Sequence, residues 1–126
     1  MKYKVFIVDD ETAAIDILKF FCQRHFSGVL EVIGFARGID EAFRKIKELQ
    51  PDLIFLDIRM PRGYGYELLA RFPKRLFDVV IVTAALGSYD LQGQSVLGIL
   101  DKPIEEDEFI RVVQMFLNKK AKMHQE

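Results

Sequence analysis

The sequence predicts an α/β protein in which helices cover both faces of an open, doubly wound parallel sheet of five strands. Five short apolar runs, each bounded by turn signals, recur along the chain. Several of them are apolar throughout and rich in Val and Ile, which is typical of strands buried on both faces of a parallel sheet. Helical patterns alternate with these runs, and this alternation indicates right-handed crossover connections.

The expected strands cover residues 5–8, 29–35, 53–56, 79–82 and 96–100. The run 29–35 contains Glu31 and Gly34, so we expect it at an edge of the sheet.

Five helices are expected between and after the strands. Four of them follow from apolar residues at helical spacing: Ile15, Leu18 and Cys22; Ala42, Phe43, Ile46 and Leu49; Leu68, Leu69 and Phe72; Phe109, Val112, Val113, Phe116 and Leu117. The remaining helix, between residues 86 and 98, contains glycines and serines of poor helix propensity, so it is expected to be short, irregular or mobile.

Composition limits the function classes. A chain of 126 residues suits one domain, which we place at 1–120, with 121–126 as a tail or the start of a linker. The 18 basic and 19 acidic side chains leave no basic footprint, so direct nucleic-acid binding is not expected. Cys22 has no second cysteine to pair with, and neither a membrane span nor a signal peptide is evident. These observations favour a cytoplasmic protein without membrane contact.

Acidic side chains follow two of the predicted strands. Asp9 and Asp10 come after the first and Asp57 after the third, while Thr83 and Lys102 follow the last two. The carboxyl ends of parallel strands share one edge, where ligands bind. Two carboxylates about 5 Å apart repel by roughly 3 kcal/mol at an effective dielectric near 20. Bound Mg²⁺ would offset this cost and leave Asp57 as a nucleophile toward phosphorus.

Each of these residues except Asp57, whose charge would be costly at the end of a buried strand, also has an ordinary structural explanation. Asp9 or Asp10 alone would be a helix cap, Thr83 alone a strand end, and Lys102 alone a solvated charge. These separate explanations do not account for the placement of all five residues at one edge of the sheet.

Other residues are given structural roles. His25 and His124 show no carboxylate neighbour by spacing and are expected on the solvated surface, while Gly63 and Gly65 are expected to be turn glycines after Pro61.

The motifs VDDE, LDIRMP, VTAA and DKP, with Gly65, give the chain a resemblance to the receiver domains of two-component response regulators over nearly its whole length. The resemblance implies a flavodoxin-like strand order, 2-1-3-4-5, and a bound Mg²⁺. Asp10 would bind the metal directly and Asp9 mainly through water, with Asp57 and the backbone carbonyl of Arg59 as further ligands.

The resemblance also assigns the phosphoryl chemistry. Asp57 matches the phosphoacceptor, Thr83 the hydroxyl that contacts the phosphoryl group and Ala84 the adjacent amide donor. Lys102 matches the cation that bridges to the phosphoryl oxygens, and the Lys102–Pro103 bond is cis in the family. A signalling domain rather than an enzyme is implied, although it assists its own phosphoryl transfer and dephosphorylation.

The implied partner is a sensor histidine kinase or a histidine phosphotransfer protein, and dimerisation on phosphorylation is a further expectation. The IFLDIRMP and VTAA segments are similar to those of receivers joined to LytTR-type DNA-binding domains. One departure is Ile99, which stands where the family usually has Tyr or Phe as a switch. We therefore expect the signal to leave the site through 83–98 rather than through a rotamer change at Ile99.

Two other classes share parts of the pattern. A haloacid-dehalogenase-like phosphatase also ends its first strand with acids, but it needs Asp where this chain has Glu11, and it gives Asp57 no role. A flavodoxin-like flavin binder needs a hydroxyl-rich phosphate loop after the first strand, and this sequence has no such loop.

Overall fold

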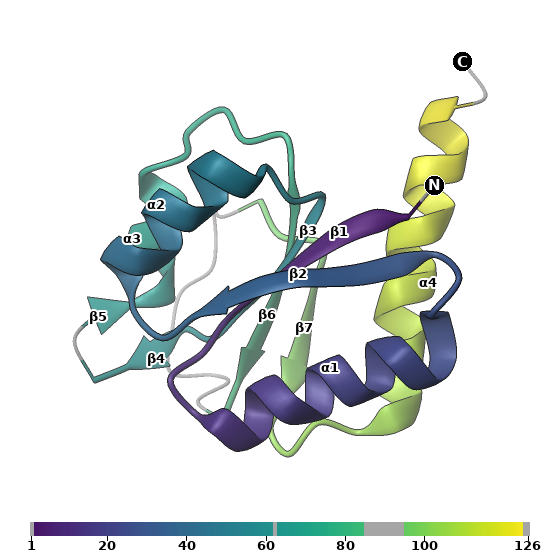
Figure 1. Ribbon diagram of the computed structural model, residues 1–126, viewed down its shortest axis with the longest axis horizontal. Coiled ribbons are helices and arrows are strands. Elements are labelled where there is room, and N and C mark those ends of the chain that lie inside the picture. Colours follow the sequence, from purple (N-terminus) through teal and green to yellow (C-terminus); the bar gives the residue numbers. More distant parts are fainter. Residues whose placement is uncertain (1, 62, 85–94, 125–126) are drawn as a thin grey trace.

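The computed structural model describes residues 2–61, 63–84 and 95–124, and it contains a five-stranded parallel sheet (Figure 1). The strand order is β2-β1-β3-β6-β7, with the short pair β4-β5 forming a separate sheet. The strands of the main sheet are therefore in the predicted order, 2-1-3-4-5. They are β1 (Tyr3–Val8), β2 (Leu30–Ala36), β3 (Leu53–Leu56), β6 (Asp78–Thr83) and β7 (Gly98–Asp101).

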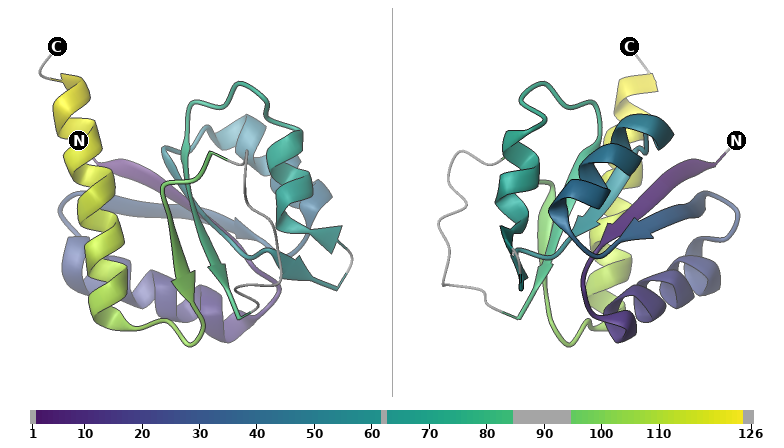
Figure 2. Two further views of the ribbon diagram at one scale, coloured as in Figure 1. Left: turned by 180° about the vertical axis from the view of Figure 1, so that it is seen from behind. Right: turned by 60° about the vertical axis from the view of Figure 1, so that its left-hand side comes forward.

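Helices lie on both faces of this sheet, as the two further views show (Figure 2). They are α1 (Thr12–Phe26), α2 (Ile39–Leu49), α3 (Gly65–Ala70) and α4 (Glu106–His124). The predicted helix between residues 86 and 98 cannot be compared, because residues 85–94 lie outside the described part of the chain. The last helix continues to His124, so it extends into the segment 121–126 that the sequence assigned to a tail.

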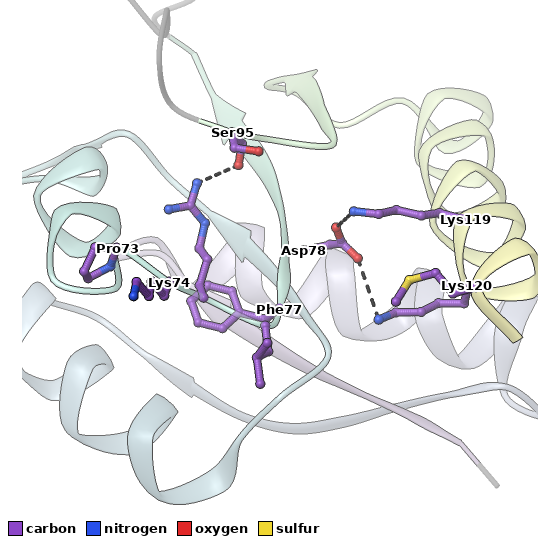
Figure 3. Close-up of a pocket in the computed structure, with 10 residues that line it drawn as sticks. Pro73, Lys74, Phe77, Asp78, Ser95, Lys119 and Lys120 are labelled. Atoms are coloured by element: carbon purple, nitrogen blue, oxygen red, sulfur yellow. Dashed lines mark hydrogen bonds and ion pairs between the residues drawn. The ribbon is translucent and has the colours of Figure 1, made fainter. Parts of the chain in front are cut away.

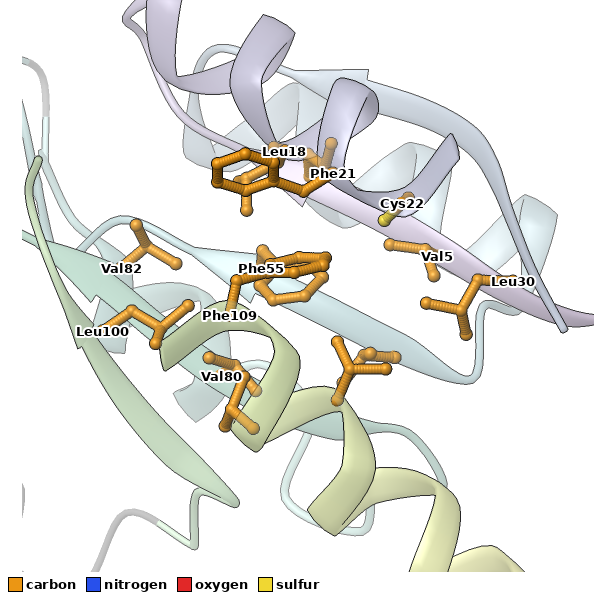
Figure 4. Close-up of a cluster of buried hydrophobic side chains, with 14 of the residues drawn as sticks. Val5, Leu18, Phe21, Cys22, Leu30, Phe55, Val80, Val82, Leu100 and Phe109 are labelled. Carbon is orange, nitrogen blue, oxygen red and sulfur yellow. The ribbon is translucent and has the colours of Figure 1, made fainter. Parts of the chain in front are cut away.

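Two apolar clusters, one on each face, hold these layers together. Val5 and Ile7 of β1 pack with α1 and α4, whereas Phe6 and Val8 pack with α2 and α3. This alternation is the two-residue period of a strand, and both sets are buried because helices cover both faces. In the α1–α4 cluster the rings of Phe55 and Phe109 stack at a centroid distance of 5.7 Å (Figure 4).

Strand β2 is at the edge, as predicted. Its pairing with β1 is irregular, because the register shifts between Val5 and Phe6. Three cationic side chains surround the ring of Phe35 on this strand: Lys19 from α1, Lys45 from α2 and Arg37 from the following turn. The Nζ atom of Lys45 also donates to the backbone carbonyl of Phe35, at 3.1 Å.

The connection from β3 to α3 differs from the simple turn expected after Pro61. Strands β4 (Arg59–Met60) and β5 (Gly63–Tyr64) form a small antiparallel pair. Gly63 belongs to β5 and Gly65 is the first residue of α3, so the expectation that both are turn glycines was wrong. Its backbone N–H donates to the Ile58 carbonyl at 2.6 Å, which fixes the start of α3 against the segment that carries Asp57.

The single cysteine and the hydropathy of the helices bear on two simple properties of the chain. Cys22 is buried on the apolar side of α1, and burial raises the pKa of its thiol to about 12, which makes it an inert core residue. Within the described ranges, none of the helices combines the length and the hydropathy needed to cross a membrane.

Candidate functional site

The predicted site residues lie where the strands of the sheet end. Asp9 directly follows β1 and Asp57 follows β3, and the last residues of these strands, Val8 and Leu56, are register partners. The Asp57 N–H donates to the Val8 carbonyl at 2.9 Å. On the other side of β3, the Lys102 N–H donates to the Thr83 carbonyl at 3.1 Å. Backbone pairing thus carries these residues to the same edge, as expected.

Four carboxylates converge at this edge. One oxygen from each of Asp9, Asp10, Glu11 and Asp57 lies within 4.8 Å of the others. Asp9 and Asp57 are 1% and 3% exposed, so water screens them poorly. At an effective dielectric near 20, two charges at this separation repel by about 3 kcal/mol. Such a concentration of negative charge favours a bound cation.

Local hydrogen bonds orient the two buried carboxylates in the same way. Oδ1 of Asp9 accepts from the Glu11 N–H at 2.9 Å, and Oδ1 of Asp57 accepts from the Arg59 N–H at 3.1 Å. Both contacts join residues two apart, the spacing of Asx turns. Burial raises the pKa of Asp9 above its ordinary value, although the Glu11 amide and Lys102 act in the opposite direction, and the negative charge of Asp57 adds to the rise.

Lys102 reaches into this group from the loop after β7. Its Nζ lies 2.6 Å from Oε1 of Glu11, 2.9 Å from Oδ2 of Asp9 and 3.1 Å from Oδ2 of Asp57. Burial opposes the charge on Lys102, but the carboxylates outweigh it and raise the pKa of the ammonium group. The Lys102–Pro103 peptide bond is cis, as the family resemblance implied.

The oxygen atoms at this edge suit a hard divalent cation. Oδ2 of Asp9 is buried and receives no aligned hydrogen bond, even though the Lys102 ammonium is near it. Among the described residues, no hydrogen bond or ion pair holds the Asp10 carboxylate. Asp10 and Arg59 line one hollow of about 460 Å³ beside the acids. The Asp10 carboxylate and this Asp9 oxygen, which accepts no aligned hydrogen bond, fit Mg²⁺, which prefers oxygen ligands.

The two remaining predicted residues lie at the end of β6, the strand between the one that precedes Asp57 and the one that precedes Lys102. Thr83 is buried at the end of β6, and Ala84 is exposed immediately after it. Ala84, Lys102 and Glu11 line a second hollow of about 610 Å³, whose other lining residues are mostly apolar. Ile99, at the family's switch position, is 36% exposed on β7. Most of the segment 83–98, predicted to transmit the signal, lies outside the described residues.

Sequence reasoning did not assign a role to Glu11, although the structure gives it the shortest contact with Lys102. Its position directly after Asp9 and Asp10 in the VDDE motif was the available signal. The close packing of Gly65 was also missed. A Cβ atom on Gly65 would lie 2.3 Å from the carbonyl oxygen of Asp57, so a side chain there would displace the backbone of the central acid.

One prediction about the surface was wrong. His25 has a carboxylate partner, because its Nε2 lies 2.6 Å from Oε2 of Glu106 at the start of α4. The Arg24 side chain contacts the same oxygen at 3.5 Å. Hydrogen bonding to His25 lowers the pKa of Glu106. This contact joins α1 to α4 across 81 residues of sequence, which is why local spacing did not reveal it.

A third hollow, of about 490 Å³, lies far from the acids, at the amino end of β6 (Figure 3). Two of the three lysines that line it are engaged, because Asp78 forms ion pairs with Lys119 and, at 3.9 Å, with Lys120. The guanidinium of Arg75 donates to the Ser95 carbonyl at 2.6 Å. The ion pairs of Asp78 therefore connect α4 to the sheet.

Comparison with known proteins agrees with this geometry. The family described as the response regulator receiver domain matches residues 5–114. The chain therefore belongs to the response regulator receiver domain family. This membership displaces the phosphatase and flavin-binder alternatives.

Two relatives illustrate the relationship. An uncharacterized response regulatory protein of Vibrio cholerae serotype O1 is 37% identical over 119 residues, which cover 92% of this chain and 49% of that protein. The sensory transduction protein LytT of Bacillus cereus is 31% identical over 121 residues, covering 93% of this chain and 48% of its own length. The chain spans about half the length of these curated relatives.

Solved structures show the same fold. The signal receiver domain of a Luxo repressor protein, described as putative, from Vibrio parahaemolyticus superposes with a TM-score of 0.81 at 25% identity. The match covers 99% of this chain and 96% of that one.

Proposed function

We propose that this chain is a Mg²⁺-dependent phosphoacceptor switch, in which Asp57 receives a phosphoryl group and later loses it to water. The observation that carries the proposal is the state of the Asp57 carboxylate. It is buried, one oxygen is fixed by the Arg59 N–H and the other contacts Lys102, in the middle of a group of acids. A carboxylate held in this way is oriented as a nucleophile, and a purely structural role would not explain the surrounding negative charge.

The side chains around Asp57 have complementary roles in this proposal. Phosphoryl transfer spreads negative charge over the equatorial oxygens of the phosphoryl group, so fixed positive groups and donors stabilise it. Lys102 would bridge to these oxygens, while the Thr83 hydroxyl and the Ala84 amide would donate to them. The position of Thr83 and Ala84 at the end of the neighbouring strand supports this assignment.

Metal binding is assigned to the acids on the other side of Asp57. Asp10 would bind Mg²⁺ directly, Asp9 mainly through water, and Asp57 and the Arg59 carbonyl would complete the protein ligands. Two observations support this division: among the described residues no hydrogen bond or ion pair holds the Asp10 carboxylate, whereas Oδ2 of Asp9 already lies 2.9 Å from the Lys102 ammonium. The bound ion would neutralise charge on the carboxylates and on the transferred group.

The proposed phosphodonor is a sensor histidine kinase or a histidine phosphotransfer protein in the cytoplasm. The switch would regulate an output domain or a separate partner, and phosphorylation would favour a dimer. Support for an output comes from the relatives, which are about twice as long and include transcriptional regulatory proteins. The near balance of charge supports an output role without direct nucleic-acid contact by this chain.

The test is phosphorylation by a small phosphodonor. The protein is incubated with Mg²⁺ and acetyl phosphate and its intact mass is measured, with beryllofluoride binding as a second readout. We expect one phosphoryl adduct in the natural sequence and none after Asp57→Asn. Asp78→Asn is the matched control, because it removes a lysine-paired carboxylate at the other end of the sheet. An adduct that persists in Asp57→Asn, or one that disappears with Asp78→Asn, would contradict the assignment.

A further inference from the structure

The ammonium group of Lys102 is shared unequally among three carboxylates. Its shortest contact, 2.6 Å, is the hydrogen bond to Glu11, and the contact with Asp57 is longer at 3.1 Å. The oxygen of Asp9 at 2.9 Å receives no aligned hydrogen bond. The shortest hydrogen bond of Lys102 is therefore to Glu11, which has no role in the proposed phosphoryl transfer.

These contacts also differ in burial. The side chain of Lys102 is 12% exposed and that of Asp57 is 4% exposed, whereas that of Glu11 is 60% exposed. An ion pair with a solvated carboxylate is weak, because water solvates both charges once they separate. Lys102 can therefore leave Glu11 at small cost, while a buried anion that gains charge would attract the ammonium group strongly.

Helix capping does not explain the position of the Glu11 side chain. Glu11 is the N-cap residue of α1, and its backbone carbonyl accepts a hydrogen bond from the Ile15 N–H at 3.2 Å. Its side chain makes no capping hydrogen bond. Instead it extends to a lysine that is 91 residues away in the sequence.

We infer that Glu11 is a positioning residue, which holds the Lys102 ammonium group at the solvent side of Asp57 until a phosphoryl group on Asp57 draws it away. This inference rests on the proposed function of Asp57. Glu11 stabilises the unphosphorylated arrangement only, and its negative charge also opposes an incoming phosphoryl group. Both effects make Glu11 lower the affinity of the site for phosphoryl oxygens, so it sets the phosphodonor strength needed to switch the domain.

The experiment measures the dissociation constant of beryllofluoride at saturating Mg²⁺ in the natural protein and in Glu11→Gln. The variant should bind the mimic about two- to fivefold more tightly, the range expected for loss of an exposed ion pair. Glu11→Asp keeps the charge but shortens the side chain, so it should shift the affinity in the same direction. Asp16→Asn, which removes another exposed acid of α1, should leave the affinity unchanged.

The outcomes separate this inference from the function on which it rests. If the natural protein binds no beryllofluoride and takes up no phosphoryl group, the proposed function itself fails. If it binds the mimic and Glu11→Gln does not change the affinity, only the role of Glu11 is overturned. A loss of about tenfold or more in Mg²⁺ affinity for Glu11→Gln would make Glu11 a metal ligand and would also overturn the inference.

A spectroscopic readout tests the movement of the lysine. The NMR signals of the Lys102 ε-methylene group should shift on adding beryllofluoride to the natural protein. Glu11→Gln should already displace these signals without the mimic. Unchanged Lys102 signals in that variant would show that the contact does not position the lysine in solution.

Discussion

At the carboxyl ends of the strands one ammonium group contacts three carboxylates, whereas at the amino end of β6 one carboxylate contacts two ammonium groups. In the first group Lys102 forms ion pairs with Asp9, Glu11 and Asp57. In the second, Asp78 forms ion pairs with Lys119 and Lys120. Both groups contain a largely buried aspartate paired with lysine. Among the described residues, only the first group has a buried side-chain oxygen that accepts no aligned hydrogen bond, Oδ2 of Asp9, although the Lys102 ammonium lies 2.9 Å from it.

The difference teaches how a binding site can be told from a structural ion pair. At the amino end, each oxygen of the single Asp78 carboxylate has a lysine beside it, and these contacts fix α4 against β6 (Figure 3). At the carboxyl end, acids outnumber the cation that pairs with them, and we expect this excess to lower the stability of the protein without metal. The proposed Mg²⁺ site would account for this excess of acids.

The largest expected effect comes from Gly65→Ala. A Cβ atom there would lie 2.3 Å from the Asp57 carbonyl oxygen, so either the backbone at Asp57 or the start of α3 must move. We expect the free energy of unfolding to fall by about 3 kcal/mol, with loss of phosphoryl uptake. Urea unfolding and intact mass measure the two effects. Gly28→Ala is the control, because no heavy atom lies within 4 Å of its added Cβ. Equal stability of the two variants would refute the close-packing argument.

The second prediction concerns Mg²⁺ binding at the carboxyl end. Asp10→Ala should weaken Mg²⁺ binding by about tenfold or more, and by more than Asp9→Ala, because a direct carboxylate ligand contributes most. Asp78→Ala should leave it unchanged, since the cations beside Asp78 already neutralise it. Calorimetric titration measures all three. Equal losses for Asp9→Ala and Asp10→Ala would mean that the direct ligand is assigned wrongly.

The third prediction compares an Asp→Asn substitution at the two ends of the strands. Asp78→Asn should lower the free energy of unfolding by about 1–2 kcal/mol, because it leaves two lysines without their carboxylate. Asp57→Asn in the absence of metal should raise it by about 1 kcal/mol, because it removes one crowded charge and leaves Lys102 two other partners. Chemical denaturation with a chelator present checks both. Effects of the same sign would remove the distinction between the two ends.

The smallest expected effect is a pH dependence at Asp9. Burial raises the pKa of this carboxyl group above its unfolded value, so between those two values the folded protein holds the extra proton. Stability without metal should therefore fall as pH rises through that window, and remain lower above it. Asp9→Asn should raise the melting temperature at neutral pH and have less effect at about pH 4. A larger rise in melting temperature at the acidic pH would contradict the predicted direction of the pH dependence.

Sequence alone predicted the features that depend on local pattern. The apolar runs gave all five strands, and the edge position of β2 followed from Glu31 and Gly34. The convergence of Asp9, Asp10 and Asp57 followed from the geometry of parallel strands, because strand ends share one edge.

The features that sequence missed depend on contacts between distant segments. The partners Lys102 and Glu11 are 91 residues apart, and His25 and Glu106 are 81 apart. No spacing rule connects such residues. The role of Gly65 was also hidden, because the fit of α3 against the Asp57 backbone is a property of packing rather than of turn preference.

The edge strand β2 has a consequence for self-association. An exposed edge offers unpaired backbone groups to the strands of other chains, which is a route to aggregation. Here the register shift beside Phe6 distorts the strand, and Lys45 occupies the Phe35 carbonyl. The positive charges of Lys19, Arg37 and Lys45 around Phe35 would repel the same segment of a second copy. These features of the β2 edge therefore disfavour edge-to-edge pairing between copies of the domain when its concentration is high.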